Sequence, residues 1–80
     1  YVLDKVLGTI TMFSRTSYGQ DVLDAIQAYN NSDYTKSETC WNNVIRKDAN
    51  SDIAYFGLGK IKLMENDYQQ AMKYFKLAKH

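Results

Sequence analysis

Asn66–His80 reads NDYQQAMKYFKLAKH, and a looser copy of this stretch, SDYTKSETCWNNVIR, lies at Ser32–Arg46. A shift of 34 residues places Trp41 on Phe75 and Val44 on Ala78. Within each copy the matched positions are three or four residues apart, which puts them on one face of a helix. The repetition therefore predicts two copies of one structural unit.

A further helical pattern precedes each copy. Tyr18–Asn30 carries apolar residues on one face, and Asp52–Met64 is apolar nearly all round, which predicts a central helix buried between its neighbours. Short polar breaks follow both segments and favour antiparallel packing of the flanking helices. We therefore expect an all-α domain at 17–80, made of two helix-turn-helix hairpins with helices at 18–30, 33–47, 52–64 and 67–79.

The ends of these helices carry capping signals. Ser17 with Gln20 three residues later fits a capping box, and Asp33 and Asp67 are placed to cap or charge-stabilise the second and fourth helices. These residue types satisfy the free N–H groups of a first helical turn, so they support the helix starts proposed above.

Two glycines interrupt the third helical pattern. Because glycine inside a helix costs up to about 1 kcal/mol relative to alanine, Gly57 and Gly59 predict a close approach of helix backbones. We expect Gly59 to face Ala71, while Phe75 and Trp41 fill the wider gaps between hairpins.

The segment SDIAYFGLGKIKLMENDYQQAMKYFKLAKH resembles the tetratricopeptide repeat, whose pattern sets an aromatic and then Leu-Gly on its first helix, and Ala, an aromatic and Ala on its second. The matching residues are Tyr55, Leu58, Gly59, Ala71, Phe75 and Ala78. The preceding repeat matches more loosely, with Ala25, Ser37, Trp41 and Val44 at the small and aromatic positions and Ala49 in place of the usual proline. The resemblance covers 18–80 and implies right-handed superhelical stacking of the hairpins. It also implies a packing core of Tyr34, Trp41, Val44, Tyr55, Leu58, Gly59, Tyr68, Ala71, Phe75 and Ala78.

Residues 1–13, YVLDKVLGTITMF, follow a different pattern. Their alternating, β-branched run predicts a β-hairpin or extended segment within 1–16. The run also resembles a strand pair of an NHL-type β-propeller blade, which implies a propeller upstream. Together with an end inside a helical pattern at His80, this leads us to expect a module of a larger bacterial multidomain protein.

Composition excludes several partners. Ten basic and nine acidic residues leave a formal charge of +1, so no field attracts nucleic acid, and no apolar run is long enough for membrane insertion. The single cysteine, Cys40, excludes an internal disulfide and leaves the redox compartment open. The alternatives for localisation are the cytoplasm or the cell envelope of a bacterium.

No pattern in the chain predicts catalysis. The one histidine, His80, is terminal, and Cys40 beside Trp41 is typical of a small buried hydrophobe rather than a reactive thiol. Asp21 and Asp24 suit a solvated helix start better than a site, and neither a metal-ligand cluster nor a phosphate-binding glycine loop occurs. We expect no enzyme activity and no cofactor in this segment.

The remaining class of function is binding. The resemblance implies that the first helix of each repeat lines a concave groove that holds a protein segment. Its positions here are Val22, Ile26, Tyr29 and Asn30, followed by Phe56, Lys60, Leu63 and Met64. Val22, Ile26 and Leu63 fit an ordinary core equally well, whereas Tyr29, Asn30, Phe56 and Lys60 combine aromatic surface with polar groups, as recognition hot spots do. We retain Tyr29, Asn30, Phe56, Lys60 and Leu63 as groove candidates.

The charges of the first helix bear on the expected ligand. Some family members clamp a C-terminal carboxylate, but YGQDVLDAIQAYN has two aspartates and no lysine or arginine. An apolar or basic-flanked protein segment is therefore the expected ligand of a non-catalytic interaction or scaffolding module. The alternatives are an accessory domain of an enzyme whose active site lies in an upstream lactonase-like propeller, and self-association into a homo-oligomer.

Overall fold

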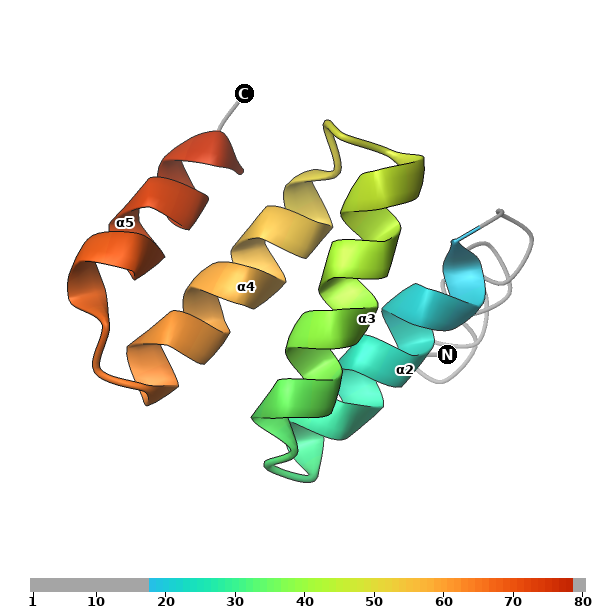
Figure 1. Ribbon diagram of the computed structural model, residues 1–80, viewed down its shortest axis with the longest axis horizontal. Helices are drawn as coiled ribbons and strands as arrows, with labels where there is room; N and C mark the ends of the chain where they lie inside the picture. The colour runs from blue at the N-terminus through green and yellow to red at the C-terminus, as the bar shows by residue number, and fades with distance from the viewer. Residues whose placement is uncertain (1–17, 79–80) are drawn as a thin grey trace, which may run out of the picture.

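The computed structural model describes residues 18–78. They form four helices, α2 (Gly19–Asn30), α3 (Tyr34–Lys47), α4 (Asp52–Met64) and α5 (Tyr68–Leu77), and no strand occurs among them. Figure 1 shows the helices side by side in chain order, as two antiparallel hairpins. The all-α fold of two helix-turn-helix hairpins is thus confirmed. The β-hairpin expected within 1–16 lies outside the described residues.

The two hairpin turns have the same conformation. Ser32 and Asn66, which are 34 positions apart, both adopt a left-handed backbone with φ of 62°. One residue later, the N–H of Asp33 donates to the carbonyl of Ala28 at 2.8 Å, and the N–H of Asp67 donates to that of Lys62 at 2.9 Å. The sequence repeat is therefore also a repeat of backbone geometry.

Side chains cap three of the four helices. The carboxylates of Asp33 and Asp67 each accept a hydrogen bond of 3.2 Å from the N–H three residues later, and the hydroxyl of Ser51 accepts one of 3.3 Å from Ala54. Such caps satisfy N–H groups that have no partner inside the helix. The N-cap position of α2 is Tyr18, which makes no side-chain cap hydrogen bond, and Ser17, the cap that we expected, lies outside the described part of the chain.

The main core lies where α2, α3 and α4 meet. Because α4 packs against each of the other helices, it has the central position expected from its apolar composition. It is nevertheless not buried all round, since Phe56, Leu63 and Met64 are exposed. The buried cluster consists of Val22, Ala25, Cys40, Trp41, Val44, Ala54, Leu58 and Ile61.

The helical glycines make room for two aromatic rings. A Cβ atom on Gly57 would lie 2.3 Å from the Trp41 indole, and one on Gly59 would lie 2.4 Å from the Phe75 ring. Trp41 of α3 lies against Gly57 of α4, in the gap between the hairpins as expected, but the same expectation for Phe75 was wrong. Phe75 packs on α4 within its own hairpin, because among the described helices α5 contacts α4 alone.

One expected core residue is at the surface. Tyr34 packs against the core beside Tyr29, at 5.4 Å between ring centroids, whereas Tyr68 at the equivalent position of α5 is 61% exposed. The difference arises because α3 has described helices on two sides and α5 has one on a single side. The repeated sequence therefore does not produce a repeated burial pattern.

Candidate binding site

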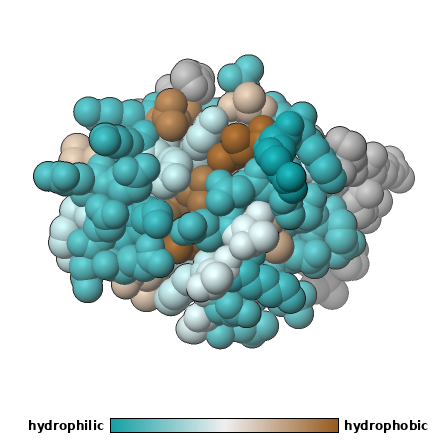
Figure 2. All heavy atoms as spheres, in the orientation of Figure 1, coloured by the Kyte–Doolittle hydropathy of each residue, from teal (hydrophilic) through white to brown (hydrophobic). Residues whose placement is uncertain are grey.

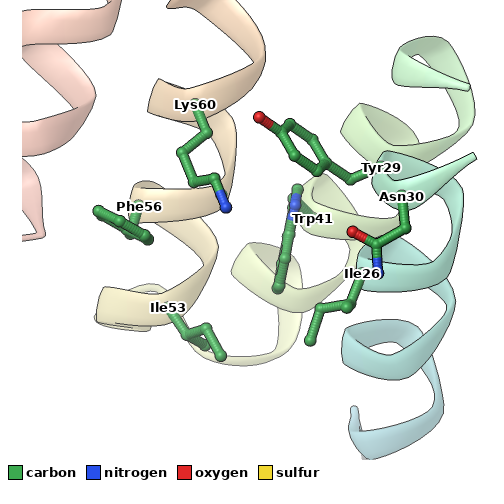
Figure 3. A pocket seen from close by; sticks show the side chains of 8 residues that line it. Ile26, Tyr29, Asn30, Trp41, Ile53, Phe56 and Lys60 are labelled. Atoms are coloured by element: carbon green, nitrogen blue, oxygen red, sulfur yellow. The ribbon is translucent and has the colours of Figure 1, made fainter. Parts of the chain in front are cut away.

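A pocket of about 260 Å³ opens between the two hairpins. Figure 2 shows hydrophobic side chains gathered near the middle of the face seen in Figure 1, with hydrophilic ones around them. Figure 3 shows side chains from α2, α3 and α4 converging on the pocket. Its lining consists of Ile26, Tyr29, Asn30, Trp41, Ile53, Phe56, Gly57 and Lys60.

Helix periodicity brings the lining residues of each helix together. Ile26 lies three and four residues before the two other lining residues of α2, and Ile53, Phe56, Gly57 and Lys60 have the same spacing along α4. The two helices thus form opposite walls. Trp41 of α3 forms the floor, because Gly57 has no side chain to exclude its ring.

The ammonium group of Lys60 lies between aromatic rings of the two walls of the pocket. The Lys60 ammonium lies 4.6 Å from the centre of the Tyr29 ring and 5.7 Å from that of Phe56. Both distances are within the range of cation–π attraction. The salt bridges of the described residues involve Lys47 and Lys62 but not Lys60. Its charge therefore faces two aromatic rings and the pocket instead of a carboxylate of these residues.

The floor carries a hydrogen-bond donor without an acceptor. Trp41 is only 3% exposed, and its indole N–H has no hydrogen-bond partner among residues 18–78. Most buried polar groups in proteins are paired, so such a donor calls for an explanation.

The acidic residues of α2 are engaged elsewhere. Asp21 pairs with Lys47 of α3 at 3.3 Å, and Asp24 accepts a hydrogen bond of 2.9 Å from Gln20. Neither lines the pocket between the hairpins. The charge of its lining is therefore positive, although the composition of the whole helix led us to expect a groove suited to apolar or basic-flanked segments. Counting charges along a helix does not distinguish its faces.

Four of the five groove candidates meet at this pocket, namely Tyr29, Asn30, Phe56 and Lys60. Leu63 is exposed on α4 but does not line it. Of the positions that fitted a core equally well, Val22 is fully buried and Ile26 lines the pocket.

Sequence reasoning missed three lining roles. Trp41 and Gly57 were expected only in helix packing, and Ile53 was not considered for the groove. The signal for Trp41 was Gly57, since a glycine inside a helix indicates that a bulky neighbour lies against it.

Cys40 is buried, and burial, with smaller contributions from Asp24 and Asp21, raises the pKa of its thiol. Between residues 18 and 78, no group of three or more His, Cys, Asp or Glu side chains could hold a metal ion. No helix within the same range is long and apolar enough to cross a membrane. His80 lies outside the described residues.

Neither protein-family models, curated proteins nor solved structures gave a match to this chain. Its function is therefore argued from the pocket and from the arrangement of its helices.

Proposed function

We propose that this chain is a non-catalytic protein-interaction module made of two tetratricopeptide-type repeats, and that the pocket between its hairpins holds a segment of a partner protein. Support for the repeat comes from the turns at Ser32 and Asn66 and the caps at Asp33 and Asp67, which recur after 34 residues with nearly the same geometry. Two hairpins related in this way present their first helices, α2 and α4, on the same side of the molecule.

The observation that carries the proposal is the convergence of Tyr29, Phe56 and Lys60 on one partly open pocket. Phe56 is 52% exposed although it is large and apolar. Aromatic side chains are enriched at protein–protein interfaces, and tyrosine is among the few residue types that dominate their affinity. The burial of Phe56 on binding would favour a complex, and the attraction between Lys60 and the Tyr29 ring would strengthen as water is excluded.

The size and lining of the pocket favour a protein segment over a small-molecule substrate. At about 260 Å³ it is slightly smaller than the roughly 300–1,000 Å³ typical of small-molecule sites. It matches one or two side chains of a segment that continues over the surface. Its lining contains no carboxylate, histidine, cysteine or serine, which are the usual nucleophiles and general bases.

The test is a peptide selection followed by NMR. Random peptides are selected on the 80-residue chain, and each selected peptide is titrated against ¹⁵N-labelled protein. We expect the largest shifts at the amides of Tyr29, Phe56 and Lys60, and at least a tenfold loss of affinity, roughly 1.4 kcal/mol, in Phe56→Ala.

The matched control is Met72→Ala, which removes a side chain of α5 that is 59% exposed and outside the pocket. This variant should bind the selected peptides as the parent chain does. A selection that enriches no peptide, or shifts confined to α5, would contradict the proposal.

Self-association is a second candidate. Beyond the pocket, α5 and the end of α4 expose Leu63, Met64, Tyr68 and Met72, and α5 packs against α4 alone among the described helices. Exposed apolar side chains at a helix face often mark an interface. Analytical ultracentrifugation over a wide concentration range tests this candidate, and a monomer throughout would remove it.

A further inference from the structure

The donor on the pocket floor indicates what kind of group the pocket takes. Trp41 is held in place because its ring fills the space opposite Gly57, so its indole N–H cannot turn away to solvent. No residue between 18 and 78 accepts a hydrogen bond from it. Leaving a buried donor unpaired is unfavourable, and a ligand that brings an acceptor removes that cost.

A positive charge lines the same pocket as this donor. In Figure 3 the nitrogen-bearing end of the Trp41 ring points to the side of the pocket on which Lys60 and Tyr29 lie. The Lys60 side chain is long and flexible, and its ammonium is held there by the Tyr29 and Phe56 rings, without a carboxylate from the described residues. An acceptor that enters at this point and reaches the buried indole nitrogen would pair with an N–H group and an ammonium together.

The rest of the lining is apolar. Ile26 and Ile53 line opposite sides of the pocket, and Phe56 lies at its edge beside Lys60. The ligand group should therefore have an apolar stem and a negatively charged, hydrogen-bond-accepting end. The volume of about 260 Å³ restricts it to little more than one side chain.

We propose that the pocket recognises a glutamate side chain of the partner segment, with its carboxylate accepting hydrogen bonds from the Trp41 indole N–H and the Lys60 ammonium and its methylenes packed between Ile26 and Ile53. Charge complementarity selects this occupant, because the only charged residue of the lining is a lysine. A charge-assisted hydrogen bond is also stronger than a neutral one. This inference rests on the proposed function and names the side chain that the proposed segment presents.

The chain contains a single tryptophan, so its indole N–H gives one unambiguous NMR signal. The probes are two capped pentapeptides, Ala-Ala-Glu-Ala-Ala and Ala-Ala-Gln-Ala-Ala, titrated to tens of millimolar against the ¹⁵N-labelled 80-residue chain. We expect a saturable downfield shift of the indole proton with the glutamate peptide and about tenfold weaker binding of the glutamine peptide.

Two variants separate the donor from the charge. Lys60→Met removes the ammonium and keeps the Trp41 signal, and Trp41→Phe removes the indole N–H and keeps an aromatic ring. Each should reduce the preference for glutamate over glutamine to within about twofold. Lys73→Met, which removes an exposed lysine of α5 outside the pocket, should leave the preference unchanged. Since Trp41→Phe alters the core, circular dichroism must first show that it folds, and Lys60→Met decides the test if it does not.

The outcomes distinguish this inference from the proposed function. Equal binding of the two peptides, an unmoved indole signal or no response to the glutamate peptide would overturn the glutamate assignment. If peptides from the random selection still shift the amide signals of Tyr29 and Phe56, the proposed interaction module holds without the glutamate assignment. If they do not shift these signals, the proposed function fails as well.

Discussion

The buried hydroxyl of Ser37 donates a hydrogen bond of 2.8 Å to the main-chain carbonyl of Ala25, and this bond joins α3 to α2. The second repeat has Ala71 at the equivalent position, and both residues are fully buried. A small side chain is thus needed at both positions, but only the first hairpin adds a polar link between its helices.

Replacing Ser37 by alanine tests the strength of that link. Ser37→Ala should lower the free energy of unfolding by about 1 kcal/mol, the usual net contribution of one hydrogen bond. Urea denaturation followed by circular dichroism measures the change. Thr39→Ala is the control, because the exposed Thr39 hydroxyl bonds only to the carbonyl of Thr35 in its own helix. An equal effect of both substitutions would show that the hydrogen bond between α2 and α3 adds nothing to the free energy of unfolding.

The two helical glycines should differ in their tolerance of alanine. Gly57→Ala places a methyl group against the buried Trp41 indole and should destabilise by about 2 kcal/mol despite the better helix propensity of alanine. In Gly59→Ala the added methyl group meets Phe75, which is only half-buried and can shift. The gain in helix propensity, about 1 kcal/mol, then roughly offsets the steric cost, so the net change in stability should be smaller than 1 kcal/mol.

Thermal unfolding followed by circular dichroism ranks the two variants. Combining Gly57→Ala with Trp41→Phe should recover part of the loss, because the smaller ring leaves room for the added methyl group. A more severe effect at Gly59 than at Gly57 would contradict the packing described here.

Ser32 and Asn66 share the same left-handed backbone conformation, so each can be replaced by the residue type of the other. Asparagine tolerates this backbone conformation better than serine does, so Ser32→Asn should stabilise the chain and Asn66→Ser should destabilise it, each by about 0.5 kcal/mol. Chemical denaturation of both variants checks the opposite signs. Changes of the same sign would mean that the side chains act through other contacts.

The buried thiol should be protected in the folded chain. Burial is the main cause of the raised pKa of Cys40, so little thiolate forms at neutral pH, and the thiolate is the reactive species. Labelling by a thiol reagent should therefore be slow in buffer and accelerate with urea in parallel with unfolding. The double variant Cys40→Ala, Thr39→Cys moves the thiol to an exposed position and should react rapidly without urea. Rapid labelling of native Cys40 would contradict its burial.

A lysine bridge should make stability depend on alkaline pH. Lys62 lies 3.1 Å from Glu38 of α3 and 3.1 Å from Glu65, and these contacts, with Glu38 the larger cause, raise the pKa of Lys62. A raised pKa of a cation means that its stabilising effect is fully present below the ordinary lysine pKa of about 10.4 and is lost as the pH rises through the higher folded-state value.

We therefore expect Lys62→Gln to cost less than about 1 kcal/mol at neutral pH, with the difference from the parent chain disappearing at strongly alkaline pH. Urea denaturation of both proteins at neutral and at alkaline pH measures this difference. Lys73→Gln, which removes an exposed lysine outside the salt bridges of the described residues, is the control for the loss of one positive charge. A Lys62→Gln effect that persists at alkaline pH would exclude the bridge as its cause.

Much of the fold follows from short-range patterns. The apolar spacing of Tyr18–Asn30 and Asp52–Met64, the polar breaks after them and the capping aspartates predicted a four-helix, all-α chain, and the structure has these four helices. Four of the five groove candidates also lie together, because residues three and four apart on a helix share a face whatever that helix packs against.

Tertiary contacts decided what local patterns do not encode. Tyr34 and Tyr68 have the same place in the repeat, yet only Tyr34 is covered by helices on two sides. In the same way, Asp21 lies outside the groove and pairs with Lys47. A count of charges along α2 could not show on which face of the helix this charge lies.

Helix positions and caps were thus readable from the chain alone, since each depends on residues within one or two turns of one another. The pocket, its positive charge and the unpaired Trp41 donor required the tertiary structure. They depend on how closely Gly57 allows α4 to approach α3 and on which faces of α2 and α4 meet across the gap, and both are settled by packing between hairpins.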